Sequence, residues 1–294
     1  MKSWPSGELR LEGIEVTDNA DEADVFTCPG NIRCFEIPGK HGVLDIAKMQ
    51  QLPHFKGKES RNVFMDCSDN FTKPINLPII FIRCDVRTWM LPHDPNTIQV
   101  AWPVEDFAEC IPVPDGGFKY DVSFHAWLSS DARIQASNSC KQNARLKCDI
   151  AEYSDFTGYI YDQPEGIRRR AEFRRSMQES RLALCPESIP GVLPYRFFEA
   201  MSAGRCPVLV GSDYVLPFAD EIPYEDFIIR CHTTDASRVA QYVHGILKMP
   251  DAYLIEKGLQ ARHYWEKFLN ANDWPKIMAY AVSKKIGALC PTAA

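Results

Sequence analysis

A chain of 294 residues with 45% hydrophobic and 24% charged residues has a globular composition and is long enough for two domains of ordinary size. Its formal net charge of −6 excludes the broad basic face by which proteins usually bind nucleic acid. No apolar run reaches the ~18 residues of a membrane-spanning helix, and the opening MKSWPSGELRLEG lacks a signal-peptide core, so we expect a soluble, cytoplasmic protein without an integral membrane segment.

The first half of the chain predicts a sheet of short strands. Several lack polar alternation, as expected when both faces of a sheet are covered. Apolar segments bounded by turn residues predict strands at 24–28, 62–65, 78–82 and 97–101. Prolines become dense after residue 92, and PVPDGG at 112–117 is the strongest break in the chain, so we place the domain boundary there.

In the second half, predicted strands alternate with predicted helices, which indicates a parallel sheet. The strands are expected at 120–127, 182–185, 206–211 and 227–231 and the helices at 131–147, 164–180, 194–203, 235–248, 251–269 and 275–286. The helix at 164–180 carries the one basic cluster, RRR at 168–170 followed by Arg174 and Arg175. Such a run is usually a solvated helix face, and attraction of an anionic ligand is the alternative.

Several chemistries have no signature in the sequence. GxGxxG, GxxxxGK[ST], HExxH and GxSxG are absent, which removes the usual signals of dinucleotide binding, P-loop NTPases, zincins and α/β-hydrolases. The 7 histidines show no zinc-binding spacing, and the 11 cysteines contain no CxxC pair and are expected to be reduced. No two aspartates stand at i and i+2, which argues against the metal-holding Asp-x-Asp of one class of sugar transferases.

The strongest functional signal is the stretch LCPESIPGVLPYRFFEAMSAGRCPVLVGSDYVLPF at 184–218. Pro194 suits a first helical turn and Gly204 suits a left-handed cap, which together predict a helix between two strands. Ligands of open α/β sheets bind at the carboxyl ends of strands, beside helix N-termini. The loop at 186–193 and the positive end of this helix therefore predict a phosphate site.

Arg196 and Glu199 are three residues apart and share one face of the predicted helix. The guanidinium of Arg196 suits a diphosphate, and the carboxylate of Glu199 suits the vicinal hydroxyls of a ribose. From spacing alone, a surface ion pair between the two remains an open alternative.

The same stretch resembles the hallmark of the exostosin-like glycosyltransferases, family 47. That family shows a strand ending in Cys-Pro, a Gly-containing loop, an Arg-x-x-Glu-Ala helix, Gly-x-x-Pro-Val and a segment with Asp and Tyr that ends in Leu-Pro-Phe. The corresponding residues here are Cys185 and Pro186, Gly191, 196–200, 204–208 and 213–218. Weaker similarity at 20–29 and 120–133 brings the resemblance to about half of the chain.

The resemblance implies a GT-B fold, in which two Rossmann-like domains with parallel sheets face each other across a cleft. On this basis we expect an acceptor-side domain at 1–115, a nucleotide-sugar-binding domain at 118–270, and a helix at 271–294 packing back on the first domain. Family members are inverting transferases that use UDP-sugars without an essential metal. Retaining GT-B enzymes carry a second glutamate where this chain has Gly191, which also favours inversion.

Carried over residue by residue, the resemblance assigns the ribose to Glu199 and the diphosphate to Arg196 and the loop at 188–193. Donor-binding residues expected from this loop and its surroundings are Ser188, Gly191, Tyr195 and Arg133, the last as a second phosphate ligand. A Ser or Thr commonly stands two residues before the helix arginine, whereas Pro194 stands here, so one phosphate contact of the family has no counterpart.

An inverting transfer needs a base that takes the proton of the acceptor hydroxyl. The loop after the strand at 62–65 holds Asp69 and Asp66, and we expect Asp69, or else Asp66, to be this base. Each has the alternative of an ordinary turn carboxylate. Glu105 and Asp106 stand at a comparable strand end and are further candidates.

Two other groups of side chains have a structural interpretation beside a functional one. His125 is expected to be a core histidine, with contact to the donor phosphate as the alternative. Trp89, Trp102 and Trp127 are expected to be core anchors, with stacking of one of them on an acceptor sugar as the alternative.

Taken together, the sequence predicts an inverting glycosyltransferase that moves a sugar from a UDP-sugar to a hydroxyl of an oligosaccharide or glycoconjugate acceptor. Xylose, glucuronic acid and galactose are among the candidate sugars. No cofactor and no metal are expected. The missing membrane anchor fits an enzyme of a bacterial cell or of the host cell of a large virus. The alternative function is a catalytically inactive nucleotide- or glycan-binding module of the same fold.

Overall fold

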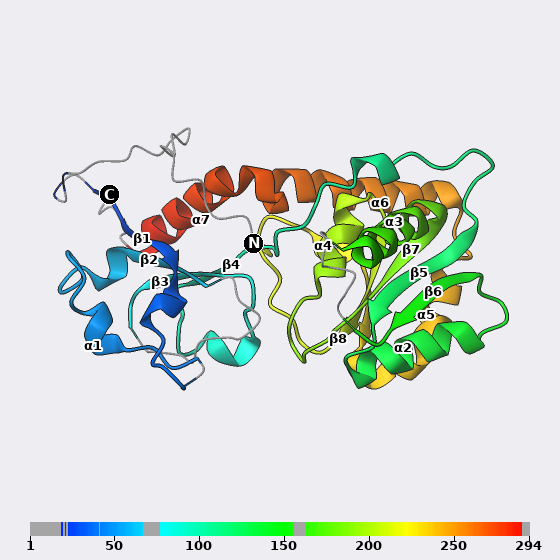
Figure 1. The fold of residues 1–294 in the computed structure, drawn as a ribbon. Coiled ribbons are helices and arrows are strands. Elements are labelled where there is room, and N and C mark those ends of the chain that lie inside the picture. Colours follow the sequence, from blue (N-terminus) through cyan, green and yellow to red (C-terminus); the bar gives the residue numbers. More distant parts are fainter. Residues whose placement is uncertain are drawn as a thin grey trace. The chain divides into compact units, whose positions relative to one another are not determined.

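A computed structural model describes residues 19, 21, 23–40, 42–66, 77–155 and 163–289 (Figure 1). Within these residues the chain forms two parallel sheets with helices around them, which confirms the α/β class predicted from the sequence. The chain divides into two compact units, which we call unit 1 (Met1–Trp102 with Ala271–Ala294) and unit 2 (Pro103–Asn270).

Unit 1 contains a sheet in the order β1-β2-β3-β4, with every neighbouring pair parallel. Its strands are β1 (Phe26–Asn31), β2 (Asn62–Asp66), β3 (Ile80–Arg83) and β4 (Thr97–Gln99). Its helices are η1 (Ile32–Phe35), α1 (Ile46–Met49), η2 (Glu59–Arg61), η3 (Thr88–Met90), η9 (Ala271–Asp273) and α7 (Trp274–Leu289). All four strands overlap the segments predicted from apolar runs.

The core of unit 1 is built from the apolar residues that the strands and short helices bury. Its buried cluster consists of Ile32, Phe35, Leu44, Met49, Phe55, Phe64, Ile79 and Phe81. The last helix of the described residues, α7, belongs to the same unit, where Lys285 Nζ donates a hydrogen bond to Pro95 O at 2.7 Å.

Unit 2 contains a sheet in the order β6-β5-β7-β8-β9, again parallel throughout. Its strands are β5 (Tyr120–Trp127), β6 (Cys148–Tyr153), β7 (Ser180–Pro186), β8 (Cys206–Gly211) and β9 (Ile229–His232). Its α-helices are α2 (Asp131–Gln142), α3 (Pro164–Glu179), α4 (Tyr195–Ser202), α5 (Val239–Ile246) and α6 (Asp251–Tyr264). Shorter turns of helix are η4 (Ala108–Cys110), η6 (Tyr224–Asp226), η7 (Thr233–Arg238) and the π-helical η8 (Trp265–Leu269).

Helices cover both faces of the unit 2 sheet, as Figure 1 shows. α2 and α5 pack on one face, where the buried core includes Val122, Phe124, Ala136, Cys140, Leu182, Leu184, Val208, Val210, Val239 and Val243. α3 and α4 lie on the opposite face, where alternate residues of β5 meet them, and Ser123 Oγ lies 3.9 Å from Met177 Sδ of α3. Coverage on both faces explains why the strands read as continuous apolar runs.

The helix of the predicted donor motif begins and ends within one residue of its expected bounds. Pro194 is its N-cap. At its end, Gly204 has a φ of 64°, its N–H donates to Met201 O at 3.0 Å, and Arg205 N donates to Ala200 O at 2.9 Å. This is the Schellman arrangement for which a glycine in the left-handed region is suited.

Two expectations along unit 2 differ from the structure. The helix expected at 131–147 ends at Gln142, and the strand β6 was not expected. Among the described residues β6 pairs only with β5, at the edge of the sheet, and its sequence CDIAEY carries charged residues that obscure the apolar signal.

The division between the units falls after Trp102, ahead of the PVPDGG turn at 112–117. The segment between these points is held by unit 2: Phe107 N donates to Ser202 Oγ at 2.9 Å, and Ser202 Oγ donates to Glu105 O at 3.0 Å. Long-range hydrogen bonds of this kind, rather than the turn chemistry, decide where a segment belongs.

Candidate functional site

The predicted phosphate loop follows β7 and leads into α4 at the carboxyl edge of the unit 2 sheet. Phe197, Phe198 and Met201 of α4 are fully buried, as their expected packing against the sheet requires. Gly191 in the loop is buried and has a φ of 77°, in the left-handed region that favours glycine. Of the other predicted donor residues there, Ser188 and Tyr195 are half-buried.

Arg196 projects from α4 into the interior of unit 2 and is 5% exposed. Its Nη2 atom donates a hydrogen bond to His125 O of β5. The guanidinium lies over the rings of Phe124 and Phe173, at 5.1 and 5.2 Å from their centroids. Its buried Nε atom has no hydrogen-bond partner among the described residues. A buried charged donor without an acceptor is costly, so this Nε lacks a hydrogen bond that a ligand or an ordered water would supply.

Glu199 lies one turn further along α4 and is 1% exposed. Its Oε1 atom accepts a hydrogen bond from Arg170 Nη1 of α3 at 2.7 Å, whereas its buried Oε2 atom has no partner in the described part of the chain. The surface ion pair between Arg196 and Glu199 that their spacing allows is not formed, because both side chains are buried and each has a different partner.

Arg170 joins Glu199 to a second carboxylate. Its Nε and Nη2 atoms lie 3.4 Å from Glu105 Oε2, which also accepts a hydrogen bond from Arg174. Burial acts to raise the pKa of Glu105, but the charges and hydrogen bonds of Arg170 and Arg174 outweigh it and lower that pKa. Glu105 is therefore a partner of arginines, and as a weak base it is a poor candidate for taking a proton.

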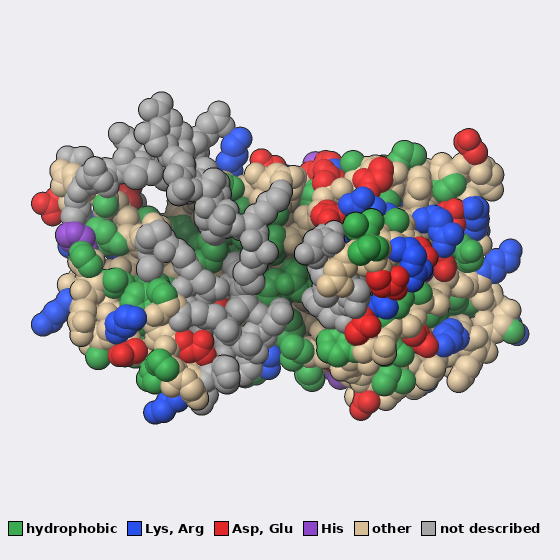
Figure 2. Space-filling model, in the orientation of Figure 1, with side chains coloured by type: hydrophobic (Ala, Val, Ile, Leu, Met, Phe, Trp, Pro, Cys, Tyr) green, Lys and Arg blue, Asp and Glu red, His purple; other side chains and the backbone are tan. Residues whose placement is uncertain are grey.

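Sequence analysis did not separate Arg170 from the rest of the basic cluster. The available signal was its helical phase, since Gly166, Arg170, Phe173 and Met177 recur at the spacing of one helix face, and this face is the buried one. Arg168 of the same cluster follows the solvated alternative, because it is exposed and pairs with Glu165 and Glu172. Figure 2 shows such basic and acidic side chains interleaved on this side of unit 2.

Arg133, the expected second phosphate ligand, lies at the same carboxyl edge. Its Nη1 atom donates to Trp127 O at 2.9 Å and to Ser129 Oγ at 3.2 Å, and its Nε atom donates to Pro186 O at 3.4 Å. It thereby ties the end of β5 to the end of β7. Glu187, a residue that sequence analysis missed, is also buried at this edge, where it accepts a hydrogen bond from Gly191 N at 3.0 Å.

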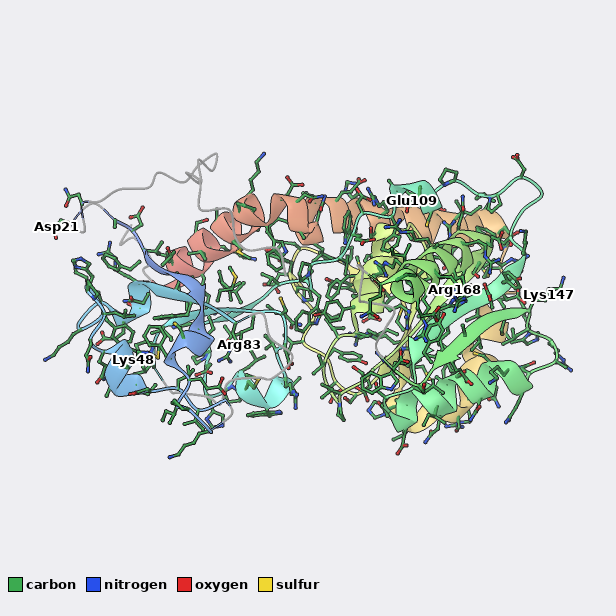
Figure 3. The ribbon with its side chains drawn as sticks, in the orientation of Figure 1. Asp21, Lys48, Arg83, Glu109, Lys147 and Arg168 are labelled. Carbon is green, nitrogen blue, oxygen red and sulfur yellow. The ribbon has the colours of Figure 1, made fainter. Side chains whose placement is uncertain are left out.

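The expected catalytic bases belong to unit 1. Asp69 lies outside the described residues. Asp66 ends β2 and is 3% exposed, and its Oδ2 atom lies 3.9 Å from Nε of Arg83, a fully buried residue that ends β3. Arg83 Nη1 also donates to Asp94 Oδ2 at 3.3 Å. Figure 3 shows Arg83 lying in the interior of unit 1. Asp66 is thus part of a buried ion-pair cluster.

His125 is a core histidine, as expected. Its Nε2 atom lies 3.3 Å from Asp149 Oδ1. Burial lowers the pKa of His125 and outweighs the opposing effect of Asp149, so the imidazole is neutral at pH 7. Among the tryptophans, Trp102 is buried as expected, whereas the expectation is wrong for Trp89 and Trp127, which are exposed.

Two further properties were searched across the described residues. None of their helices combines the length and apolar character needed to cross a membrane. In the same part of the chain, no group of three or more His, Cys, Asp or Glu side chains is arranged to hold a metal ion.

The fold and this site define an α/β protein in which α4 carries two buried polar atoms, Arg196 Nε and Glu199 Oε2, without partners among the described residues. The sequence profile described as the exostosin GT47 domain matches residues 128–247, which contain Arg133, Glu187, Arg196 and Glu199. The chain therefore contains an exostosin GT47 domain, and the resemblance seen in the sequence is confirmed for that segment.

Individual proteins similar to this chain are distant. A probable glycosyltransferase of Arabidopsis thaliana is 34% identical over 71 residues, which are 24% of this chain and 14% of the plant protein. Among solved structures, TarM is 15% identical with a TM-score of 0.43, covering 81% of this chain and 52% of TarM. HepE of Anabaena, solved in complex with UDP, is 11% identical with a TM-score of 0.47, covering 70% of this chain and 64% of HepE. The chain thus spans only part of each.

Proposed function

We propose that the protein is an inverting glycosyltransferase that moves a sugar from a UDP-sugar to a hydroxyl of a glycan acceptor. The observation that carries the proposal is the pair of buried polar atoms without partners, Glu199 Oε2 and Arg196 Nε, inside the segment that matches the exostosin GT47 domain. Such atoms cost free energy unless a ligand or ordered water completes them.

In this proposal unit 2 binds the donor. Glu199 Oε2 accepts a hydrogen bond from a ribose hydroxyl, while Arg170 holds the other oxygen of the carboxylate. Arg196 Nε and the loop at 188–193 with Ser188 and Gly191 receive the diphosphate, with Tyr195 at the first turn of α4 and Arg133 beside the loop. Backbone N–H groups at a helix N-terminus suit phosphate oxygens.

The remaining parts of the proposal concern the acceptor. Unit 1 takes the acceptor role of a GT-B enzyme, and the base is Asp69, with Asp66 as the second choice. The acceptor oxygen attacks the anomeric carbon and loses its proton to the base, while the bond from that carbon to the diphosphate oxygen breaks and UDP leaves. A positioned base contributes about 10²–10⁴-fold to the rate. Donors aimed at the leaving diphosphate add to this by stabilising its charge.

One observation favours a second candidate function, a catalytically inactive nucleotide- or glycan-binding module. Asp66 is engaged with Arg83 and is nearly inaccessible, so one of the two expected bases is poorly placed to take a proton. The transferase then depends on Asp69 as its base. Measuring UDP release from UDP-xylose, UDP-glucuronic acid and UDP-galactose, with and without added glycans, separates the two. Acceptor-dependent release supports the transferase, and UDP binding without any release supports the module.

The donor assignment predicts a large effect of Glu199→Gln. The change keeps the shape of the side chain but replaces a carboxylate acceptor, and losing a buried charged partner costs about 2–5 kcal/mol. We therefore expect the Kd for UDP to rise by about 30-fold or more, measured by isothermal titration calorimetry.

Glu152→Gln is the matched control, because Glu152 is a carboxylate of the same unit that accepts from Ser137 Oγ at 2.6 Å and Lys141 Nζ at 2.9 Å. We expect this variant to bind UDP like the wild type. An unchanged Kd for UDP in Glu199→Gln contradicts the ribose assignment.

A further inference from the structure

The loops at the carboxyl end of the unit 2 sheet are held together by one buried carboxylate. Glu187 directly follows β7 and is 2% exposed. Its Oε2 atom accepts hydrogen bonds from Gly191 N at 3.0 Å, Ser212 N at 3.1 Å and Ser212 Oγ at 3.0 Å. Its Oε1 atom accepts from Thr233 Oγ1 at 2.6 Å. One side chain therefore joins the segments that follow β7, β8 and β9.

The backbone of Glu187 is engaged as well. Its N–H donates to Val210 O of β8 at 2.9 Å, and its carbonyl accepts from Ser130 Oγ, the N-cap of α2, at 2.7 Å. Every polar group of Glu187 thus has a partner in the protein. Because the carboxylate already accepts four hydrogen bonds, it is not available to bind a ligand. Its role is to fix the conformation of the loops that donate these bonds.

The loop fixed most directly is the one between β7 and α4. Glu187 Oε2 takes the N–H of Gly191, the residue whose left-handed φ of 77° turns the chain toward α4. The N–H groups of Ser188 and Ile189, by contrast, donate to no acceptor within the described residues. Pro194, the N-cap of α4, offers no side-chain cap either. Free N–H groups in a turn beside a helix N-terminus are the ordinary ligands of phosphate.

We infer that Glu187 is a positioning residue for the donor diphosphate: it fixes the loop at 188–193 in the conformation that presents these N–H groups. The inference rests on the proposed function, because that function places the diphosphate at this loop. When the charge of Glu187 is removed, this inference and simple electrostatics predict opposite changes in the affinity for UDP. A negative charge beside a diphosphate repels it, so removal of the charge alone would strengthen binding, whereas loss of the loop conformation weakens it.

The test is the affinity of UDP and of uridine for wild type and Glu187→Gln, measured by calorimetry and, for uridine, by displacement of bound UDP. The substitution preserves side-chain volume but puts an NH₂ donor where a carboxylate oxygen now accepts, so either Thr233 or the pair Gly191 and Ser212 loses its acceptor. We expect the Kd for UDP to rise about tenfold or more, and the Kd for uridine to stay within about twofold. Glu152→Gln, the control on β6, is expected to change neither.

Each result bears on the inference. Equal losses of affinity for UDP and uridine in Glu187→Gln would show general damage to unit 2. An unchanged or tighter UDP affinity would show that Glu187 does not position the loop. Either result overturns the inference. A wild-type protein that binds neither ligand overturns the proposed function first, and this inference with it. If Glu187→Gln does not fold, Ser212→Ala and Thr233→Val decide, since each removes one donor and leaves the carboxylate. Each is then expected to weaken UDP binding severalfold without changing uridine binding.

Discussion

Both units bury an arginine between two carboxylates near the carboxyl ends of their parallel strands. In unit 1, Arg83 lies between Asp66 and Asp94, and in unit 2, Arg170 lies between Glu199 and Glu105. The clusters differ in what is left over. All three residues of the unit 1 cluster make additional interactions. Glu199, by contrast, keeps a buried oxygen without a partner in the described residues, and it stands on the same helix, α4, as the unpartnered Arg196 Nε.

The comparison teaches that a buried ion pair does not by itself mark a functional site. Replacing such a pair with apolar residues is often neutral, while removing one partner is costly, so the pair is primarily a constraint on the fold. Atoms that the fold buries and leaves incomplete are the better indicator, because only a ligand or a water can complete them. We therefore expect substitutions in the unit 1 cluster to change the stability of the fold, and substitutions in the unit 2 cluster to change the binding of UDP.

The largest expected effect tests the unit 1 side of this comparison. Arg83→Met leaves Asp66 and Asp94 buried without their shared cation, and loss of one partner of a buried pair costs about 3–5 kcal/mol. We expect the free energy of unfolding in urea to fall by about this amount, with an unchanged Kd for UDP.

The matched control is Arg230→Met, since Arg230 pairs with Glu225 at an exposed position and such pairs contribute about 1 kcal/mol or less. If Arg83→Met loses UDP affinity while its unfolding free energy stays at the wild-type value, the contrast between the units is wrong.

A smaller effect is expected for Arg170→Met. Arg170 holds Glu199 Oε1 at 2.7 Å, so its loss frees the carboxylate to rotate away from the position that presents Oε2. We expect the Kd for UDP to rise about tenfold, since a hydrogen bond between charged groups is worth about 1.5–3 kcal/mol.

A double-mutant cycle separates this role from general destabilisation. In a Glu199→Gln background, Arg170→Met should cost little further UDP affinity, because the carboxylate that it orients is already absent. Fully additive losses in the two backgrounds would mean that Arg170 does not act through Glu199.

The smallest expected effect is a pH dependence that belongs to unit 2. Because burial lowers the pKa of His125 in the folded protein, the unfolded chain binds more protons below about pH 6.5. The free energy of unfolding should therefore fall as the pH is lowered through this range, by at most ~1.4 kcal/mol per pH unit.

His125→Gln should flatten that slope, whereas His93→Gln, at an exposed position of unit 1, should retain it. Burial also lowers the pKa of Arg83, but an arginine stays charged throughout this pH range, so the unit 1 cluster contributes no slope of its own. Denaturation at several pH values between 5 and 8 measures these slopes. A wild-type slope in His125→Gln would place the titrating group elsewhere.

Much of the fold could be predicted because its signals are local. β5 has the bounds expected from its apolar run, and α3 differs from its expected end by one residue. α4 ends at Ser202, two residues before Gly204, where the chain needs a left-handed residue. The motif of the exostosin GT47 domain was readable for the same reason, since its residue types stand in a fixed order within one stretch of sequence.

The rest was decided by partners that lie far apart in the chain. The charged residues of β6 hid an edge strand, and the segment after Trp102 belongs to unit 2 because of hydrogen bonds to Ser202. Neither effect leaves a local pattern.

The sequence by itself determined the α/β class, the strand–helix–strand unit around α4 and the residue types of the proposed donor motif, because turn chemistry, capping and apolar periodicity act over a few neighbouring residues. Only the tertiary structure decided that Glu199 pairs with Arg170 rather than Arg196, and that Glu187 gathers Gly191, Ser212 and Thr233. Those contacts depend on how helices and strand ends pack in three dimensions, which sets which charges meet and which atoms are left for a ligand.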